Sequence, residues 1–133
     1  MRYLARREYS YTELHNKLSL YVQEGEDLNA VLDELVKRGW LSDARATTQL
    51  VHAKRSRFGI QRIAYELRQK GIPENLIIEA MPELKETELD TALEVWQRKF
   101  GTIAQDAKEK GKQMRFLQSR GFSMDIILKI LNS

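Results

Sequence analysis

Residues 55–77 read RSRFGIQRIAYELRQKGIPENLI, and this stretch shows how the chain is built. Its apolar residues recur at i, i+3, i+4 and i+7, a spacing that places them on one side of a helix. They are Ile60, Ile63, Ala64 and Leu67. Gly71 suits the end of that helix, and Pro73 suits the first turn of the next one. The stretch therefore predicts a helix, a tight turn and a second helix.

The same pattern recurs along the chain. Five residues have counterparts of the same type 50 positions later in the chain. Leu67, Gly71, Ile72, Leu76 and Ile77 correspond to Leu117, Gly121, Phe122, Ile126 and Ile127. At a shift of 49, Tyr9-Ser10 matches Phe58-Gly59, and Phe100-Gly101 resembles that pair again. Repeats of this length are typical of stacked helical units that share apolar faces with their neighbours.

The hydrophobic period is helical nearly everywhere, and no strand-like alternation extends beyond four residues. Ser10 and Glu13 have the spacing of a capping box. Met81-Pro82 is expected to end a helix, because proline lacks a backbone N–H. The expected helices are approximately 2–8, 10–21, 27–38, 42–57, 59–70, 73–81, 84–100, 105–120 and 123–132. We therefore predict an all-α protein of three tandem three-helix repeats in an elongated, slightly curved array, with units at 1–41, 42–82 and 83–133.

The composition limits the compartment and the kinds of site. The 133 residues contain no cysteine, which excludes disulfides and cysteine-based zinc sites. No apolar stretch approaches the roughly 18 residues that a membrane span needs. The opening MRYLARREYS has no apolar segment of the kind a secretory signal needs. We expect a cytoplasmic protein that does not associate with membranes.

Sequence motifs of enzymes and cofactor sites are missing. The chain has no Gly-rich phosphate loop, H-E-x-x-H, G-x-S-x-G or Cys–His arrangement. His15 and His52 have no close carboxylate partner in the sequence. A nuclease whose magnesium ligands converge from distant segments is the open alternative, and no motif supports it. We predict that the protein is not an enzyme and that it has no catalytic, metal-binding or cofactor-binding residues and no cofactor.

The net charge of +3 hides a strong segregation of charge. Residues 52–70 hold six bases and one acid (+5), residues 74–94 seven acids and one base (−6), and residues 98–120 seven bases and two acids (+5). A charged run is usually a solvated helix face, and acids near a helix N-terminus complement its dipole. These ordinary interpretations account best for the acidic block.

The basic blocks favour a second interpretation. Lys108, Lys112 and Arg115 lie at i, i+4 and i+7 and therefore share one helix face. Arg62 and Arg68 flank Tyr65 on another face. Like charges on one face cost stability, so their concentration suggests an anionic partner, either a phosphate backbone or the acidic surface of a protein.

Four motifs, taken in order, resemble the RecX family of recombination regulators over essentially the whole chain. The opening Leu4-Ala5-Arg6-Arg7-Glu8-Tyr9-Ser10 resembles the start of that family's first repeat. The junction to the second repeat is similar in residues 31–45, VLDELVKRGWLSDAR. Residues 55–72 have the pattern Arg-x3-Gly-x2-Arg-Ile-x2-Glu-Leu-x2-Lys-Gly-Ile, which resembles the family's middle repeat. Residues 98–122 resemble its third repeat.

The resemblance implies a regulator of DNA recombination, DNA repair and the SOS response. Family members bind the RecA recombinase filament on single-stranded DNA and suppress its ATP hydrolysis, strand exchange and co-protease activity. They also bind DNA themselves, so single-stranded and also double-stranded DNA are expected partners, and we expect a monomer. Carried over by position, the contact residues are Arg55, Arg57, Arg62, Arg68, Lys70, Lys108, Lys112, Arg115 and Arg120.

Two other functions are compatible with the residues. One is a stand-alone DNA-binding protein of helix-turn-helix type, whose recognition helix would enter the major groove. The other is a helical adaptor for a different acidic partner.

Overall fold

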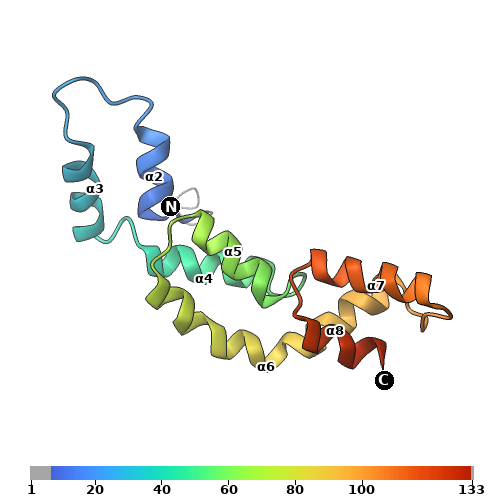
Figure 1. Cartoon of the computed structure of the whole chain (residues 1–133). Coiled ribbons are helices and arrows are strands. Elements are labelled where there is room, and N and C mark those ends of the chain that lie inside the picture. The colour runs from blue at the N-terminus through green and yellow to red at the C-terminus, as the bar shows by residue number, and fades with distance from the viewer. Residues whose placement is uncertain (1–6, 133) are drawn as a thin grey trace.

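The computed structural model describes residues 7–132, and within that range the chain is all-helical and has no strand. The helices are α2 (Tyr11–Leu18), α3 (Leu28–Lys37), α4 (Asp43–Lys54), α5 (Ile60–Gln69), α6 (Glu74–Lys99), α7 (Ala107–Ser119) and α8 (Met124–Leu131). Figure 1 shows an elongated, bent arrangement, with α2 and α3 at one end and α7 and α8 at the other. The predicted all-α class is confirmed.

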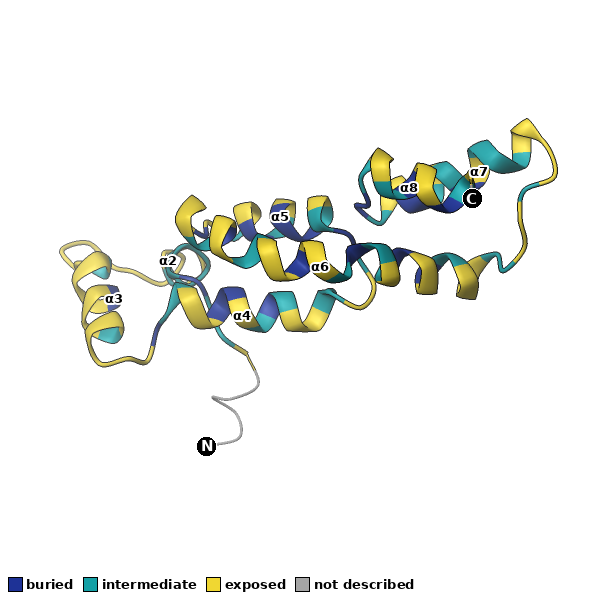
Figure 2. Cartoon of the chain, turned by 90° about the horizontal axis from the view of Figure 1, so that it is seen from below, coloured by how far each residue is buried: buried dark blue, intermediate teal, exposed yellow. Residues whose placement is uncertain are grey.

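Two apolar cores lie one after the other along the molecule. The first is formed by α4, α5 and the start of α6, and it buries Ala46, Leu50, Ile63, Ala64, Leu67, Ile72, Ile77 and Leu84. The second is formed by the end of α6 with α7 and α8, and it buries Ala92, Val95, Leu117, Phe122, Ile127 and Ile130. By contrast, α2 buries no residue and α3 buries only Leu32. In Figure 2, α3 is largely exposed, whereas α2 is mostly of intermediate burial.

The helix that joins the two cores corrects the sequence prediction. The expected stop at Met81-Pro82 is wrong, because α6 runs without interruption through Pro82. Proline in a helix interior loses one hydrogen bond and costs about 3 kcal/mol. Here the first half of the helix is buried in the first core through Ile77 and Leu84, on either side of the proline, and the second half is buried in the second core through Val95. We infer that this packing outweighs the cost of the proline.

The chain before α2 also differs from the prediction. Most of the expected helix 2–8 lies outside the described residues, and Arg7 and Glu8 belong to no helix. The division at 1–41, 42–82 and 83–133 stays our proposal, and its second border falls inside α6.

The second helices of the three units meet end to end. At one junction the C-terminal end of α5 contacts the N-terminus of α2, where the predicted capping box of Ser10 and Glu13 is present. The Ser10 hydroxyl donates to the carbonyl of Lys70 at 2.5 Å. Gly71 follows with φ +72°, and a Cβ at this position would overlap the side chain of Thr12. Only glycine fits this contact without a shift.

The second junction repeats this arrangement between α7 and α5. The backbone N–H of Gly59 donates to the carbonyl of Arg120 at 2.7 Å, and that of Gln61 donates to the carbonyl of Gly121 at 3.1 Å. A Cβ at Gly59 would overlap the backbone of Gly121, and a Cβ at Gly121 would overlap Arg62. The two helix ends thus satisfy each other's free backbone groups. The helices α7, α5 and α2 therefore follow one another along one edge of the molecule (Figure 1).

Acid is expected to weaken the junction between α5 and α2. Glu13 accepts hydrogen bonds from Lys70 Nζ at 2.7 Å, from the backbone N–H of Ser10 at 3.0 Å and from Arg7 at 2.7 Å. Burial alone would raise the pKa of Glu13, but these hydrogen bonds and the charges of Lys70 and Arg7 hold it below its ordinary value of 4.5.

Because the pKa of Glu13 is lower in the folded state, its stabilisation is present above pH 4.5 and is lost as the pH falls through the folded-state pKa. We expect the free energy of unfolding, measured by urea titration near neutral pH and in acid, to fall more for the wild type than for Glu13→Gln. Equal losses in the two proteins would contradict this role of the carboxylate.

Candidate functional site

The structure separates the nine predicted contact residues into two groups. Four of them form ion pairs with acids: Arg55–Glu83 at 2.9 Å, and Arg62–Glu66, Arg68–Glu74 and Lys70–Glu13 each at 2.7 Å. The other five form no ion pair with any residue that the structure describes: Arg57, Lys108, Lys112, Arg115 and Arg120. The positive charge of the second group is therefore not tied up in ion pairs with described residues, so it is available to an anion.

The pair of Arg68 and Glu74 illustrates the first group. The hydrogen bond between the two side chains raises the pKa of Arg68 and lowers the pKa of Glu74, and the opposite charges act in the same direction. Both groups therefore stay ionised, and each offsets the charge of the other. Arg68 remains half-exposed, with a side-chain exposure of 56%. Because it is paired with Glu74, Arg68 attracts an anion less strongly than an unpaired arginine would.

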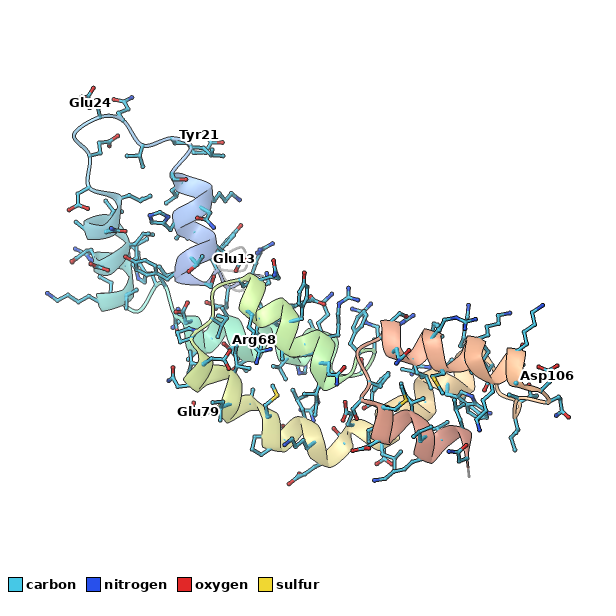
Figure 3. The ribbon with its side chains drawn as sticks, viewed as in Figure 1. Glu13, Tyr21, Glu24, Arg68, Glu79 and Asp106 are labelled. Atoms are coloured by element: carbon cyan, nitrogen blue, oxygen red, sulfur yellow. The ribbon has the colours of Figure 1, made fainter. Side chains whose placement is uncertain are left out.

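The free cations of α7 lie on its exposed side. Lys108, Lys112 and Arg115 lie outside the apolar core that α7 helps to form, as their i, i+4 and i+7 spacing predicted. Tyr65 on α5 is also exposed, at 58%. Figure 3 shows nitrogen-tipped side chains projecting from α5 and α7 toward the same side of the molecule. The C-terminal end of α7 meets the N-terminal end of α5. We define the free cations of α7 and of this junction as the basic edge: Arg57, Lys108, Lys112, Arg115 and Arg120.

An aromatic ring at the junction of α7 and α5 gathers four cations around it. Their distances to the centre of the Phe58 ring are 5.1 Å for Lys54, 5.5 Å for Arg57, 4.8 Å for Arg62 and 5.3 Å for Arg120. Cation–π contacts of this kind hold the guanidinium and ammonium groups in place. Sequence reasoning missed this role of Phe58, although the recurring Phe-Gly pair was a signal of its importance.

Metal ligands, pockets and membrane-spanning helices are the other features of the described residues that bear on function. They contain no group of three or more His, Cys, Asp and Glu side chains that could hold a metal ion. His52 lines a shallow pocket of about 340 Å³ between α4 and α6, together with Glu79 and Arg55. None of the described helices is long and apolar enough to cross a membrane. Fold and site thus define a class: a helical-repeat protein with a basic edge on one helix and at its junction with a neighbouring repeat.

Comparison with known proteins then assigns the family. Residues 42–81 match the model of the second three-helix domain of RecX, and residues 86–131 match that of the third. Relatives named "Regulatory protein RecX" include those of Leptothrix cholodnii, 44% identical over 98% of this chain and 83% of the relative, and Chromobacterium violaceum, 41% identical over 96% and 83%. The chain belongs to the RecX family of regulatory proteins.

Solved structures agree on the fold. The crystal structure of RecX from Lactobacillus salivarius has a TM-score of 0.77 at 18% identity and covers 98% of this chain and 90% of its own. A second crystal structure, of a regulatory protein RecX, has a TM-score of 0.78 at 21% identity and covers 98% of this chain and 68% of its own. The predicted helical-repeat fold and the resemblance to the family are both confirmed.

Proposed function

We propose that this protein binds the RecA recombinase filament on single-stranded DNA and inhibits its ATPase, strand exchange and co-protease activities. In this way it would modulate homologous recombination, DNA repair and the SOS response, without catalysing a reaction itself. The observation that carries the proposal is the basic edge of α7 and its junction with α5, in a chain whose relatives are named regulatory proteins. Its cations Arg57, Lys108, Lys112, Arg115 and Arg120 have no acidic partner within residues 7–132.

A filament on DNA presents the kind of surface that this edge suits. Its DNA strand carries one negative charge per phosphate, and a protein that neutralises phosphates with Lys and Arg gains free energy by releasing counterions. The free cations extend along α7 to its junction with α5. A linear partner can therefore engage several of them at once, whereas a small anion could engage only a few.

The proposal predicts inhibition of RecA at low protein concentration. Substoichiometric protein is expected to lower ATP hydrolysis by RecA on saturating single-stranded DNA, measured by phosphate release. Saturating DNA matters, because simple competition for DNA would then leave the rate unchanged. An unchanged rate at equimolar protein would rule out the proposal.

The same experiment separates the two alternatives. A stand-alone DNA-binding protein of helix-turn-helix type would leave the RecA rate unchanged on saturating DNA and would show sequence-specific affinity that survives moderate salt. An adaptor for another acidic protein would leave the RecA rate unchanged and would not bind DNA.

A further inference from the structure

A small basic pocket lies where three segments of the chain converge. The end of α6, the segment before α5 and the end of α7 enclose a volume of about 270 Å³. Four cations line it, together with Val95 and Phe116: Arg57, Arg98, Lys99 and Arg120. Two of these cations, Arg98 and Lys99, are not among the contact residues that the sequence predicted. We propose that this pocket binds a backbone phosphate of single-stranded DNA.

The charge in the pocket is poorly offset. Arg98 contacts Glu94 at 3.8 Å, but both side chains are about two-thirds exposed, at 69% and 66%, so water screens this pair strongly. Arg57, Lys99 and Arg120 have no acidic partner among the residues that the structure describes. Four like charges around one small volume repel one another, and a bound anion removes that repulsion.

The attraction of cations to helix C-termini does not explain why all four cations gather here. Lysine and arginine often gather at helix C-termini, where free carbonyls carry partial negative charge. At the end of α7, however, the carbonyls of Arg120 and Gly121 already accept hydrogen bonds from the backbone N–H groups of Gly59 and Gln61. The Arg120 guanidinium itself donates to the carbonyl of Arg57 at 3.3 Å. This neutral acceptor leaves the charge of Arg120 without a counter-ion.

Before any ligand binds, aromatic rings contact three of the four cations: Arg57, Lys99 and Arg120. The Arg120 guanidinium carbon lies 5.3 Å from the centre of the Phe58 ring and 5.1 Å from that of Phe116. Lys99 Nζ lies 5.5 Å from the Phe116 ring centre. Val95 forms part of the lining and is buried. Fixed cations beside an apolar wall attract an anion more strongly than mobile cations in water.

The arrangement favours phosphate over carboxylate. The cations approach from three segments and therefore from several directions, which suits the tetrahedral oxygens of a phosphate, whereas a carboxylate presents two oxygens in one plane. This inference deepens the proposed function and rests on it for the source of the phosphate, the single-stranded DNA. The pocket adjoins the basic edge, because Arg57 and Arg120 belong to both.

The test compares two double variants with equal loss of charge. Arg98→Gln with Lys99→Gln removes two exposed cations that belong to the pocket and not to the basic edge, and Lys85→Gln with Lys129→Gln removes two exposed lysines elsewhere. The probe is a labelled oligothymidylate, with binding followed by fluorescence anisotropy over a range of salt concentrations. The pocket variant is expected to bind about ten-fold more weakly, with the magnitude of the slope of log K against log salt reduced by about 0.7, as for the loss of one phosphate contact. The control variant should bind as the wild type does.

Two outcomes would overturn the inference. One is equal binding by the pocket variant and the control. The other is binding of poly-glutamate as tight as that of the oligothymidylate, with the same loss in the pocket variant, which would identify an acidic peptide as the ligand. Circular dichroism of both variants checks that each is folded. RecA is absent from this assay, so loss of DNA binding in the pocket variant would support the pocket even if the ATPase experiment failed.

Discussion

Replacing Gly121 by alanine is expected to lower the free energy of unfolding by about 3 kcal/mol or more. Gly121 has φ +89°, a conformation that costs an L-residue about 1–2 kcal/mol. The new Cβ would also overlap the backbone and Cβ of Arg62 at the start of α5, and overpacking of this kind adds about 1–3 kcal/mol. The loss is large beside a total stability of about 5–15 kcal/mol for a typical domain.

Two other glycines separate these contributions. Gly39 has φ +78°, and no heavy atom beyond its own chain neighbours lies within 4 Å of the place that a Cβ would occupy, so Gly39→Ala should show the backbone cost alone. Gly59 has an ordinary φ of −82°, and its Cβ would overlap Gly121, so Gly59→Ala should show the steric cost alone. Urea titration gives all three values. A loss in Gly121→Ala no greater than that in Gly39→Ala would show that the junction tolerates a side chain.

Removing the free cations of α7 is expected to weaken inhibition of RecA by about 100-fold. Lys108, Lys112 and Arg115 lie outside the core and have no ion pair with the described residues. A solvent-exposed contact between opposite charges contributes up to about 1 kcal/mol, so three contacts correspond to about two orders of magnitude in binding. The measurement is the concentration of the triple glutamine variant that halves RecA ATPase on single-stranded DNA.

The matched control removes three lysines outside the basic edge, Lys37, Lys85 and Lys129, also to glutamine. All three are exposed, and the change in net charge is the same. The control should inhibit almost as well as the wild type. If both triple variants lose inhibition equally, net charge alone would govern the interaction and the basic edge of α7 would have no special part in it.

Local signals in the sequence were enough to predict most helices and their buried faces. Ile63 and Leu67 are buried as their spacing predicted, because helical periodicity acts between residues only three or four positions apart. The capping box of Ser10 and Glu13 is likewise local. The position of Lys108 and Lys112 outside the core follows from the same periodicity.

Interactions between distant segments escaped prediction. Pro82 lies inside α6, because packing of that helix into two separate cores outweighs the local preference of proline to end a helix. The acid that pairs with Lys70 is Glu13, which lies 57 positions away. The partner of Arg55 is Glu83, at a separation of 28. No pattern in the sequence reveals such pairs.

The sequence by itself determined the all-α class, the repeats and the identity of most candidate cations, since helix periodicity and charge are properties of short segments. The tertiary structure alone decided which of those cations remain without an acidic partner and that Arg98 and Lys99 join Arg57 and Arg120 around one pocket. The physical reason is that ion pairing depends on distances in space. Those distances are set where α7 meets α5 through Gly59 and Gly121.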